Sequence, residues 1–339
     1  MSGKRKSRLA ALAAIVPVAA IGVVACGGSD NGGSSSSGGG GGGDKVQVGL
    51  ITKTETNPFF VKMKEAAQKA AAADNADLVT ASGKFDTDNQ SQVTAIENMV
   101  TRGAKGILIT PADSKAIVPA IKKARDQGVK VIALDTPTEP QDAANALFAT
   151  DNEKAGELIG AWSKAKFAKT GETPHIVTID LAPGVSVGVL RHNGFLKGMG
   201  ITDAQVEGHA DAEGDQTKAQ GAMENLLTKV PDVNLVYTIN EPSAFGAYQA
   251  LKQAGKEKGV TIVSVDGGCS AIAKGIKPGV ISATSQQYPA KMAQMGVDAV
   301  AKDQKVSGYT DTGVTLITDD PQKGVDSKDS AYGTENCWG

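Results

Sequence analysis

Residues 46–60 read VQVGLITKTETNPFF, and they decide the fold. The apolar run Val46–Ile51 is typical of a buried strand. Asn57 before Pro58 indicates a helix start, because an asparagine side chain can cap the first turn and proline lacks the N–H that would need a partner there. In an open parallel sheet, ligands bind outside the carboxyl ends of the strands. Phe59 and Phe60, at this junction, are therefore either core residues under the first helical turn or apolar walls for a small polar ligand.

Strand and helix patterns alternate along the rest of the chain. The first predicted strands are 46–51, 78–81, 106–110 and 129–134, with helices at 58–73, 88–103 and 114–128. At 137–147 the pattern lapses into Pro, Asp, Asn and Ala, which predicts a domain boundary. Further strands follow at 175–181, from 206, and at 233–239, 260–265 and 281–285, with helices at 153–167, 187–199, 216–229 and 243–254. This alternation predicts an α/β fold of two doubly wound parallel-sheet lobes.

Composition narrows the classes of function. The 339 residues exceed the ~250–300 at which single cores stop growing, so two domains fit. The net charge of -2 argues against a nucleic-acid groove, which needs a basic excess. His175, His192 and His209 lie in separate segments without the spacing of metal ligands, so structural roles are favoured over a metal site. No nucleophile elbow, phosphate-binding loop or zinc-protease motif is present, and the sequence predicts neither an enzyme nor a cofactor.

The first residues indicate export. Four basic residues precede an apolar run, 9–25, that ends in VVAC at 23–26 and resembles a bacterial lipobox. By that resemblance, 1–26 is a lipoprotein signal peptide with Cys26 as the lipidated residue, and the protein is anchored at the outer face of the cytoplasmic membrane. An uncleaved anchor helix is the alternative, and it also places the remainder outside the membrane. The Gly/Ser-rich stretch 27–44 has the composition of a flexible tether.

Export affects how the remaining cysteines are interpreted. Cys269 and Cys337 are an even pair in a compartment that permits disulfides, which favours one bridge between them. Two isolated buried thiols are the alternative.

Several strand ends carry side chains suited to holding hydroxyl groups. The candidates are Asn57, Asp135, Asn240, Asp266 and Gln287, together with Arg191 near the start of a helix. A sugar offers many donors and acceptors at once, and hydrogen bonds to charged groups are among the stronger contacts to a neutral ligand. Each residue alone is also an ordinary cap or turn residue, but their joint occurrence in two lobes favours a sugar site. Asp135 and Asp266 as a glycosidase acid–base pair is a weaker alternative, because a lipid anchor and the absence of a general-acid environment disfavour it.

These motifs, in this order, resemble the type I periplasmic sugar-binding proteins of ABC transporters, the ribose-binding-protein class, from Lys45 onward. The matching motifs are NPFF (57–60), LD (134–135), TDN (150–152), Arg191 four residues before Phe195, INE (239–241), VDG (265–267) and QYP (287–289). The resemblance is closer still to the fructose-binding branch of that class. The strings that carry it are LITKTETNPFF (50–60), VDGGC (265–269), SQQYP (285–289) and CWG (337–339).

The resemblance implies two lobes joined by a three-strand hinge. The expected lobes are 45–150 with 288–309, and 151–287 with 310–339. Phe59 and Phe60 would contact the sugar ring, and the six polar candidates would hydrogen-bond its hydroxyls. Thr136 and Thr110 stand where ribose binders have Arg and Asn, which disfavours ribose itself. A Cys269–Cys337 bridge would tie the end of the sequence to the second lobe and leave the hinge free.

The expected function is capture of a monosaccharide, fructose or a related sugar, by lobe closure and its delivery to an ABC permease and ATPase. The alternative is a sugar sensor that presents its liganded form to a membrane receptor. A sugar-responsive repressor of the same fold is excluded, because the export signal occupies the place of a DNA-binding head. A monomer without nucleic-acid partners is expected.

Overall fold

The structure is a computed structural model that describes residues 45–339. The predicted signal peptide, the lipobox Cys26 and the tether at 27–44 lie outside the described residues. Within the described range, no helix combines the length and the apolar character that crossing a membrane requires.

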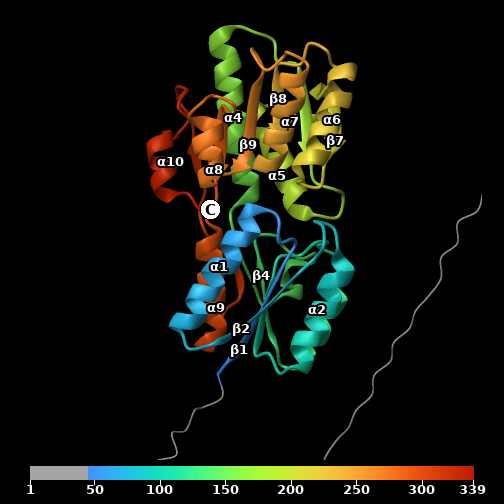
Figure 1. The fold of residues 1–339 in the computed structure, drawn as a ribbon, viewed down its shortest axis with the longest axis vertical. Helices are drawn as coiled ribbons and strands as arrows, with labels where there is room; N and C mark the ends of the chain where they lie inside the picture. The colour runs from blue at the N-terminus through green and yellow to red at the C-terminus, as the bar shows by residue number, and fades with distance from the viewer. Residues whose placement is uncertain (1–44) are drawn as a thin grey trace, which may run out of the picture. The chain divides into compact units, whose positions relative to one another are not determined.

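The described chain contains two six-stranded sheets of equivalent strand order (Figure 1). The first has the order β11 (Gly308–Asp311), β5 (Ala146–Ala149), β4 (Lys130–Leu134), β3 (Gly106–Ile109), β1 (Gln47–Thr52) and β2 (Asp77–Ser82). The second has the order β12 (Thr315–Ile317), β10 (Ala283–Gln286), β9 (Thr261–Asp266), β8 (Leu235–Thr238), β6 (Ile176–Asp180) and β7 (Gly208–Asp211). Strands in both sheets pair in parallel, except that β12 is antiparallel to β10.

Helices cover both faces of each sheet, and we call each sheet with its helices a lobe. Lobe 1 has α1 (Pro58–Ala73), α2 (Asn89–Thr101), α3 (Val118–Asp126), the short η1 (Gln141–Ala143) and α9 (Pro289–Ala301). Lobe 2 has α4 (Asn152–Thr170), α5 (Ser186–Met199), η2 (Asp203–Gln205), α6 (Gln216–Lys229), α7 (Glu241–Gln253), α8 (Cys269–Ala271), η3 (Ile272–Ile276) and α10 (Ser330–Asn336). Two parallel-sheet α/β lobes are the predicted fold class, which is confirmed.

Burial on both faces explains why the strands are continuous apolar runs. Along β1, Leu50 packs with α1 and α9 on one face, whereas its neighbour Ile51 packs with α2 and α3 on the other. Successive strand residues point to opposite faces, so both need apolar side chains. α1 then begins where the sequence predicts, with Asn57 Oδ1 accepting a hydrogen bond from the Phe59 N–H at 3.0 Å.

The chain passes between the lobes three times: between β5 and α4, between β10 and α9, and between β11 and β12. The predicted lobe ranges place the third passage near 309/310. In the structure, β11 stays paired with β5 as far as Asp311, which lies opposite Ala149. The passage therefore follows Asp311.

Two elements differ from the sequence pattern. The lapse at 137–147 does not separate the lobes, because it contains η1 and leads into β5, which pairs with β4 and β11 inside lobe 1. A four-residue strand after a proline-rich loop is too short to give a periodic signal. Helix α9 is not anticipated either; it follows the second passage and lies beside α1 (Figure 1).

Candidate ligand-binding site

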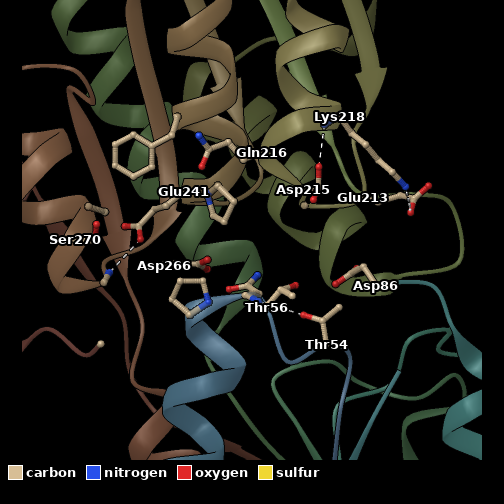
Figure 2. A pocket seen from close by; sticks show the side chains of 18 of the residues that line it. Thr54, Thr56, Asp86, Glu213, Asp215, Gln216, Lys218, Glu241, Asp266 and Ser270 are labelled. Atoms are coloured by element: carbon tan, nitrogen blue, oxygen red, sulfur yellow. Dashed lines mark hydrogen bonds and ion pairs between the residues drawn. The ribbon is translucent and has the colours of Figure 1, made fainter. Parts of the chain in front are cut away.

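A cavity of about 590 Å³ lies between the two lobes, at the carboxyl ends of their strands. Lobe 1 contributes the loops at 54–58 and 84–86, and lobe 2 contributes 213–218, 241–245 and 266–271. Figure 2 shows Thr54, Thr56 and Asp86 facing Glu241 and Asp215 across this space. The position is the one that strand-end reasoning predicts for a ligand.

Acidic side chains outnumber basic ones among the lining residues. The carboxylates are those of Asp86, Glu213, Asp215, Glu241 and Asp266, and the ammonium groups are those of Lys84 and Lys218. Lys218 is already paired with Glu213. Such a lining suits a ligand that donates hydrogen bonds and disfavours an anionic one.

Beneath the cavity, Arg191 on α5 joins the lobes through a buried ion network. Its guanidinium lies 3.6 Å from Asp135 Oδ1 of lobe 1 and 3.4 Å from Asp266 Oδ1 of lobe 2. It also donates hydrogen bonds to Asn152 Oδ1 at 2.8 Å and to the Ile239 carbonyl at 3.0 Å. Arg191, Asp135 and Asp266 are each under 5% exposed. One buried guanidinium therefore serves two carboxylates on opposite sides of the cleft.

Both strand-end aspartates have unusual backbone conformations. Asp135 follows β4 with φ 61°, and Asp266 ends β9 with φ 123°. Aspartate tolerates the left-handed helical region, where Asp135 lies. The φ of Asp266 is larger, at a value that is unfavourable for any residue with a Cβ. Strain of this kind costs roughly 1–3 kcal/mol and concentrates at ligand clamps. The fold holds both carboxylates at the cleft despite that cost.

Three buried oxygens of this region have no hydrogen-bond partner among residues 45–339: Asp86 Oδ2, Asp135 Oδ1 and Gln287 Oε1. Gln287 uses its amide nitrogen to donate to Asp266 Oδ1 at 2.7 Å, which fixes the direction of its free oxygen. Leaving such acceptors unpaired costs about 1–3 kcal/mol each. Of the three residues, only Asp86 lines the cavity directly, so its oxygen can accept a hydrogen bond from a donor that enters the cleft.

Burial changes the protonation of the carboxyl groups. Burial raises the pKa of Asp266 to about 7, against the opposing effect of Arg191. Burial also raises the pKa of Glu241 well above its usual range, and nearby Asp266 adds to this. The pKa of Asp86 is raised by burial and partly restored by Lys53, whose ammonium lies 3.9 Å away. The cleft therefore holds more carboxyl groups than its cations can stabilise in the charged form.

The structure brings four of the predicted site residues together, namely Asp135, Arg191, Asp266 and Gln287. Only Asp266 of the four lines the cavity, and the other three are buried beside it. Asn57 lines the cavity while it caps α1. Asn240 caps α7 through Oδ1 and donates through Nδ2 to the Gly214 carbonyl, so its side chain is engaged within lobe 2.

Phe59 and Phe60 lie in the hydrophobic core of lobe 1, at 3% and 5% exposure. Neither ring is among the residues that line the cavity. Both rings follow the capped first turn of α1, which directs them toward α9 and the sheet. The aromatic rings at the cavity are those of Phe85, Phe245 and Trp338.

Asp86 and Trp338, which line the cavity, and the buried Lys53 are not among the site residues predicted from the sequence. Lys53 is 2% exposed and directly follows β1, so the strand-end rule would have included it. Asp86 is in the loop after β2, at the same edge of the sheet. Trp338 adjoins Cys337, whose bridge partner Cys269 is three residues after Asp266.

The Cys269–Cys337 disulfide is present, as predicted. Both cysteines belong to lobe 2, and the adjoining Trp338 reaches lobe 1, where its ring packs against Phe59 with centroids 5.3 Å apart. The bridge therefore anchors Trp338 to lobe 2, and Trp338 also contacts lobe 1.

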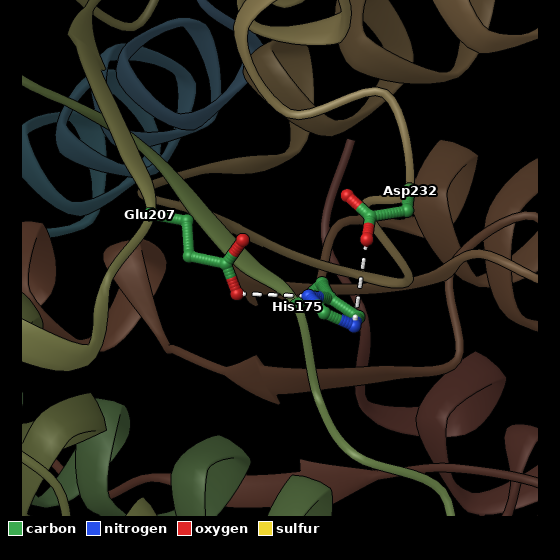
Figure 3. Close-up of side chains that lie close together, drawn as sticks. All are labelled: His175, Glu207 and Asp232. Carbon is green, nitrogen blue, oxygen red and sulfur yellow. Dashed lines mark hydrogen bonds and ion pairs between the residues drawn. The ribbon is translucent and has the colours of Figure 1, made fainter.

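His175 has two acidic neighbours (Figure 3). Its Nδ1 is 2.9 Å from Glu207 Oε1 and its Nε2 is 3.6 Å from Asp232 Oδ2. Because the two carboxylates meet different ring nitrogens, they do not converge on one point with the imidazole, as ligands of a single metal ion must. Both carboxylates are exposed, and we regard the group as a surface ion cluster.

Comparison with known proteins identifies the family. A model of the periplasmic binding protein domain matches residues 48–305. This chain belongs to the periplasmic binding protein family. Membership implies export, and the related proteins are solute-binding proteins and not enzymes, which disfavours Asp135 and Asp266 as a glycosidase pair.

Relatives of this binding protein cover most of its length. The ribose import binding protein of Salmonella typhimurium is 32% identical over 278 residues, 80% of this chain and 90% of its own. The D-ribose/D-allose-binding protein of Pseudomonas aeruginosa is 30% identical over 292 residues, 81% and 89% of the two chains. The solved Agrobacterium radiobacter carbohydrate-binding protein in complex with D-arabinose has a TM-score of 0.74 and 26% identity, covering 81% of this binding protein and 95% of its own chain.

Proposed function

We propose that the chain is the substrate-binding lipoprotein of a sugar ABC importer. It captures a monosaccharide between its lobes and delivers it to a permease driven by an ATPase. The relatives named for ribose, allose and arabinose support a sugar as the ligand.

The observation that carries the proposal is the set of unpaired buried acceptors on Asp86, Asp135 and Gln287. A monosaccharide brings several hydroxyl donors into one small volume, where Asp86 and Asp266 line the cavity and can accept from them. The acid-rich lining favours the same neutral, donor-rich ligand over a phosphorylated one.

The proposed binding residues are Asn57, Asp135, Arg191, Asp266 and Gln287. Asp135 lies on lobe 1, and Arg191 and Asp266 lie on lobe 2. A ligand that touches both sides stabilises the closed arrangement over the open one, and that difference drives closure.

Fructose or a related sugar is the specific ligand we propose. The support comes from the long strings at 50–60, 265–269 and 285–289, and from Thr136 and Thr110 in place of the Arg and Asn of ribose binders. Asp86 on the lobe 1 wall is paired with the buried Lys53, which follows β1 directly.

Titration calorimetry of the purified chain with D-fructose, D-ribose, D-allose and D-arabinose tests the proposal. We expect saturable heat with at least one sugar, strongest for fructose, and at least tenfold weaker binding by Asp135→Ala or Asp266→Ala, the size expected for a lost charged hydrogen bond. Arg102→Ala, on the exposed end of α2, is the matched control. No heat from any sugar would contradict the proposal, and ribose alone would contradict the fructose assignment.

The membrane and permease partners need a separate test in the native cell. We expect Cys26→Ser to move the protein from the membrane fraction to the soluble one. Deletion of the gene should abolish uptake of the labelled sugar, and a variant that lacks Cys26 but remains membrane-bound would contradict the anchor. The protein should elute as a monomer.

A further inference from the structure

The segment 337–339 enters the cleft between the lobes. Cys337 is bridged to Cys269 of α8, and both Trp338 and Gly339 line the cavity. In Figure 2, the labelled Ser270 and Glu241 mark the wall of lobe 2 next to this bridge. The segment thus brings side chains from beyond residue 336 to the mouth of the proposed sugar site.

Trp338 contacts three separate parts of the protein. Its carbonyl accepts a hydrogen bond from the Cys269 N–H at 2.9 Å, on lobe 2. Its indole N–H donates to the Gln287 carbonyl at 2.9 Å, at the second passage between lobes. Its ring meets Phe59 of lobe 1 edge to face, at 5.3 Å and 85°. Trp338 is 5% exposed and is one of the residues that line the cavity.

The loop under Trp338 is fixed by Glu241. Its carboxylate accepts from the Gly267 N–H at 2.6 Å and from the Gly268 N–H at 3.1 Å. A Cβ on Gly268 would stand 3.3 Å from the Trp338 ring, a tight contact that glycine avoids. The same loop joins Asp266 to Cys269, and it therefore sets the position of Trp338 relative to the carboxylate.

We propose that Trp338 is a ligand-contacting residue, the aromatic wall of the sugar cavity, and that the Cys269–Cys337 bridge holds it there. The proposal rests on the proposed function. Phe59 and Phe60 do not line the cavity, and Phe59 instead packs behind Trp338 as its support. The C–H face of a sugar ring packs well on an aromatic face, while its hydroxyls need the polar groups opposite.

Affinity measurements with the full chain test whether Trp338 contacts the ligand. D-Fructose, D-ribose, D-allose and D-arabinose are titrated into wild type, Trp338→Ala, Trp338→Phe and Trp162→Phe. For every sugar that wild type binds, we expect Trp338→Ala to bind at least about tenfold more weakly, as for a buried aromatic contact. Trp338→Phe should keep most of the affinity. Trp162 is a buried residue of α4 whose indole N–H donates to the Asp320 carbonyl, so Trp162→Phe is the matched control and should bind as wild type.

Fluorescence supplies a readout that a remote packing role would not move. The sequence has two tryptophans, so Trp162→Phe leaves Trp338 as the sole indole. We expect sugar to change the emission of this variant and to protect it from acrylamide quenching. Because the indole is then intact, this result does not depend on whether Trp338→Ala folds.

The outcomes separate the two proposals. If wild type binds no sugar, the proposed function fails and the wall fails with it. If wild type binds, then an unchanged affinity of folded Trp338→Ala, or an unchanged emission and quenching of Trp162→Phe, overturns the wall alone. The double variant Cys269→Ser/Cys337→Ser should lose affinity to the same degree as Trp338→Ala, and wild-type affinity in that variant overturns the role of the bridge.

Discussion

Lowering the pH should weaken sugar binding through Asp266. Burial raises the pKa of this carboxyl to about 7, although the Arg191 guanidinium and the amide of Gln287 both favour the charged form. A ligand hydroxyl that donates to Asp266 needs the carboxylate as its acceptor. Protonating Asp266 therefore competes with the ligand.

The size of the effect follows from the pKa. If the ligand binds the carboxylate form alone, the dissociation constant rises as one plus the ratio of proton concentration to the acid constant. With a pKa of about 7, binding is nearly unaffected around pH 8, about tenfold weaker around pH 6 and about a hundredfold weaker around pH 5. The titration of Asp266 does not weaken binding at low pH by unfolding the protein. A raised folded-state pKa gives stability that is complete below the unfolded value and is lost as pH rises through about 7, so acid favours the fold at this residue.

Calorimetry of the best-binding sugar across this pH range measures the profile, with circular dichroism to follow folding. Asp266→Asn cannot titrate, so it should bind weakly at every pH and its profile should be flat. A wild-type affinity that stays constant from about pH 5 to pH 8 would refute the reasoning, and so would an Asp266→Asn variant with the wild-type slope.

Three further perturbations have defined outcomes. Arg191→Ala leaves two buried carboxylates without their shared guanidinium and should destabilise the fold by about 3–5 kcal/mol in urea unfolding, whereas exposed Arg102→Ala should change it by about 0.5 kcal/mol or less. Removing the Cys269–Cys337 bridge, which spans 68 residues of sequence, should cost about 4 kcal/mol by the loop-entropy relation; equal unfolding midpoints with and without reductant would contradict this. The hydrogen bond and ion pair with the buried Asp180 raise the pKa of His192 to about 9. The contribution of this pair to the free energy of unfolding should be complete below about pH 6.5 and lost as the pH rises through 9. His192→Gln should remove that part of the pH dependence, and an unchanged profile would contradict the assignment.

Much of the fold is predictable because its signals are local. The sequence predicts helix 58–73 at the bounds that α1 has, since a capping asparagine and a proline mark its start and apolar spacing marks its length. Short strands have no such signal. β5 has four residues after a proline-rich loop, and its place in the sheet depends on β11, about 160 residues away. No periodic pattern can encode that pairing.

The residues of the candidate site also divide into those that a local pattern predicts and those that it does not. Asp135 and Asp266 follow strands, so chain position alone predicts that they lie at the cleft. The ligand-facing aromatic ring is different, because it depends on which side of α1 the phenylalanines face and on a bridge between distant cysteines. Phe59 has the predicted location along the chain and yet packs in the core behind Trp338. Packing between remote segments determines this, and a linear pattern does not record it.

Each lobe is assembled from segments separated in the chain, and this affects the order of folding during synthesis. Helix α9 and strand β11 complete lobe 1, yet the ribosome makes them only after nearly all of lobe 2. Until then, α1 and the β5 edge of the first sheet lack their neighbours and expose apolar surface. A nascent chain should therefore fold lobe 2 as early as lobe 1, and a fragment that stops at residue 149 should aggregate.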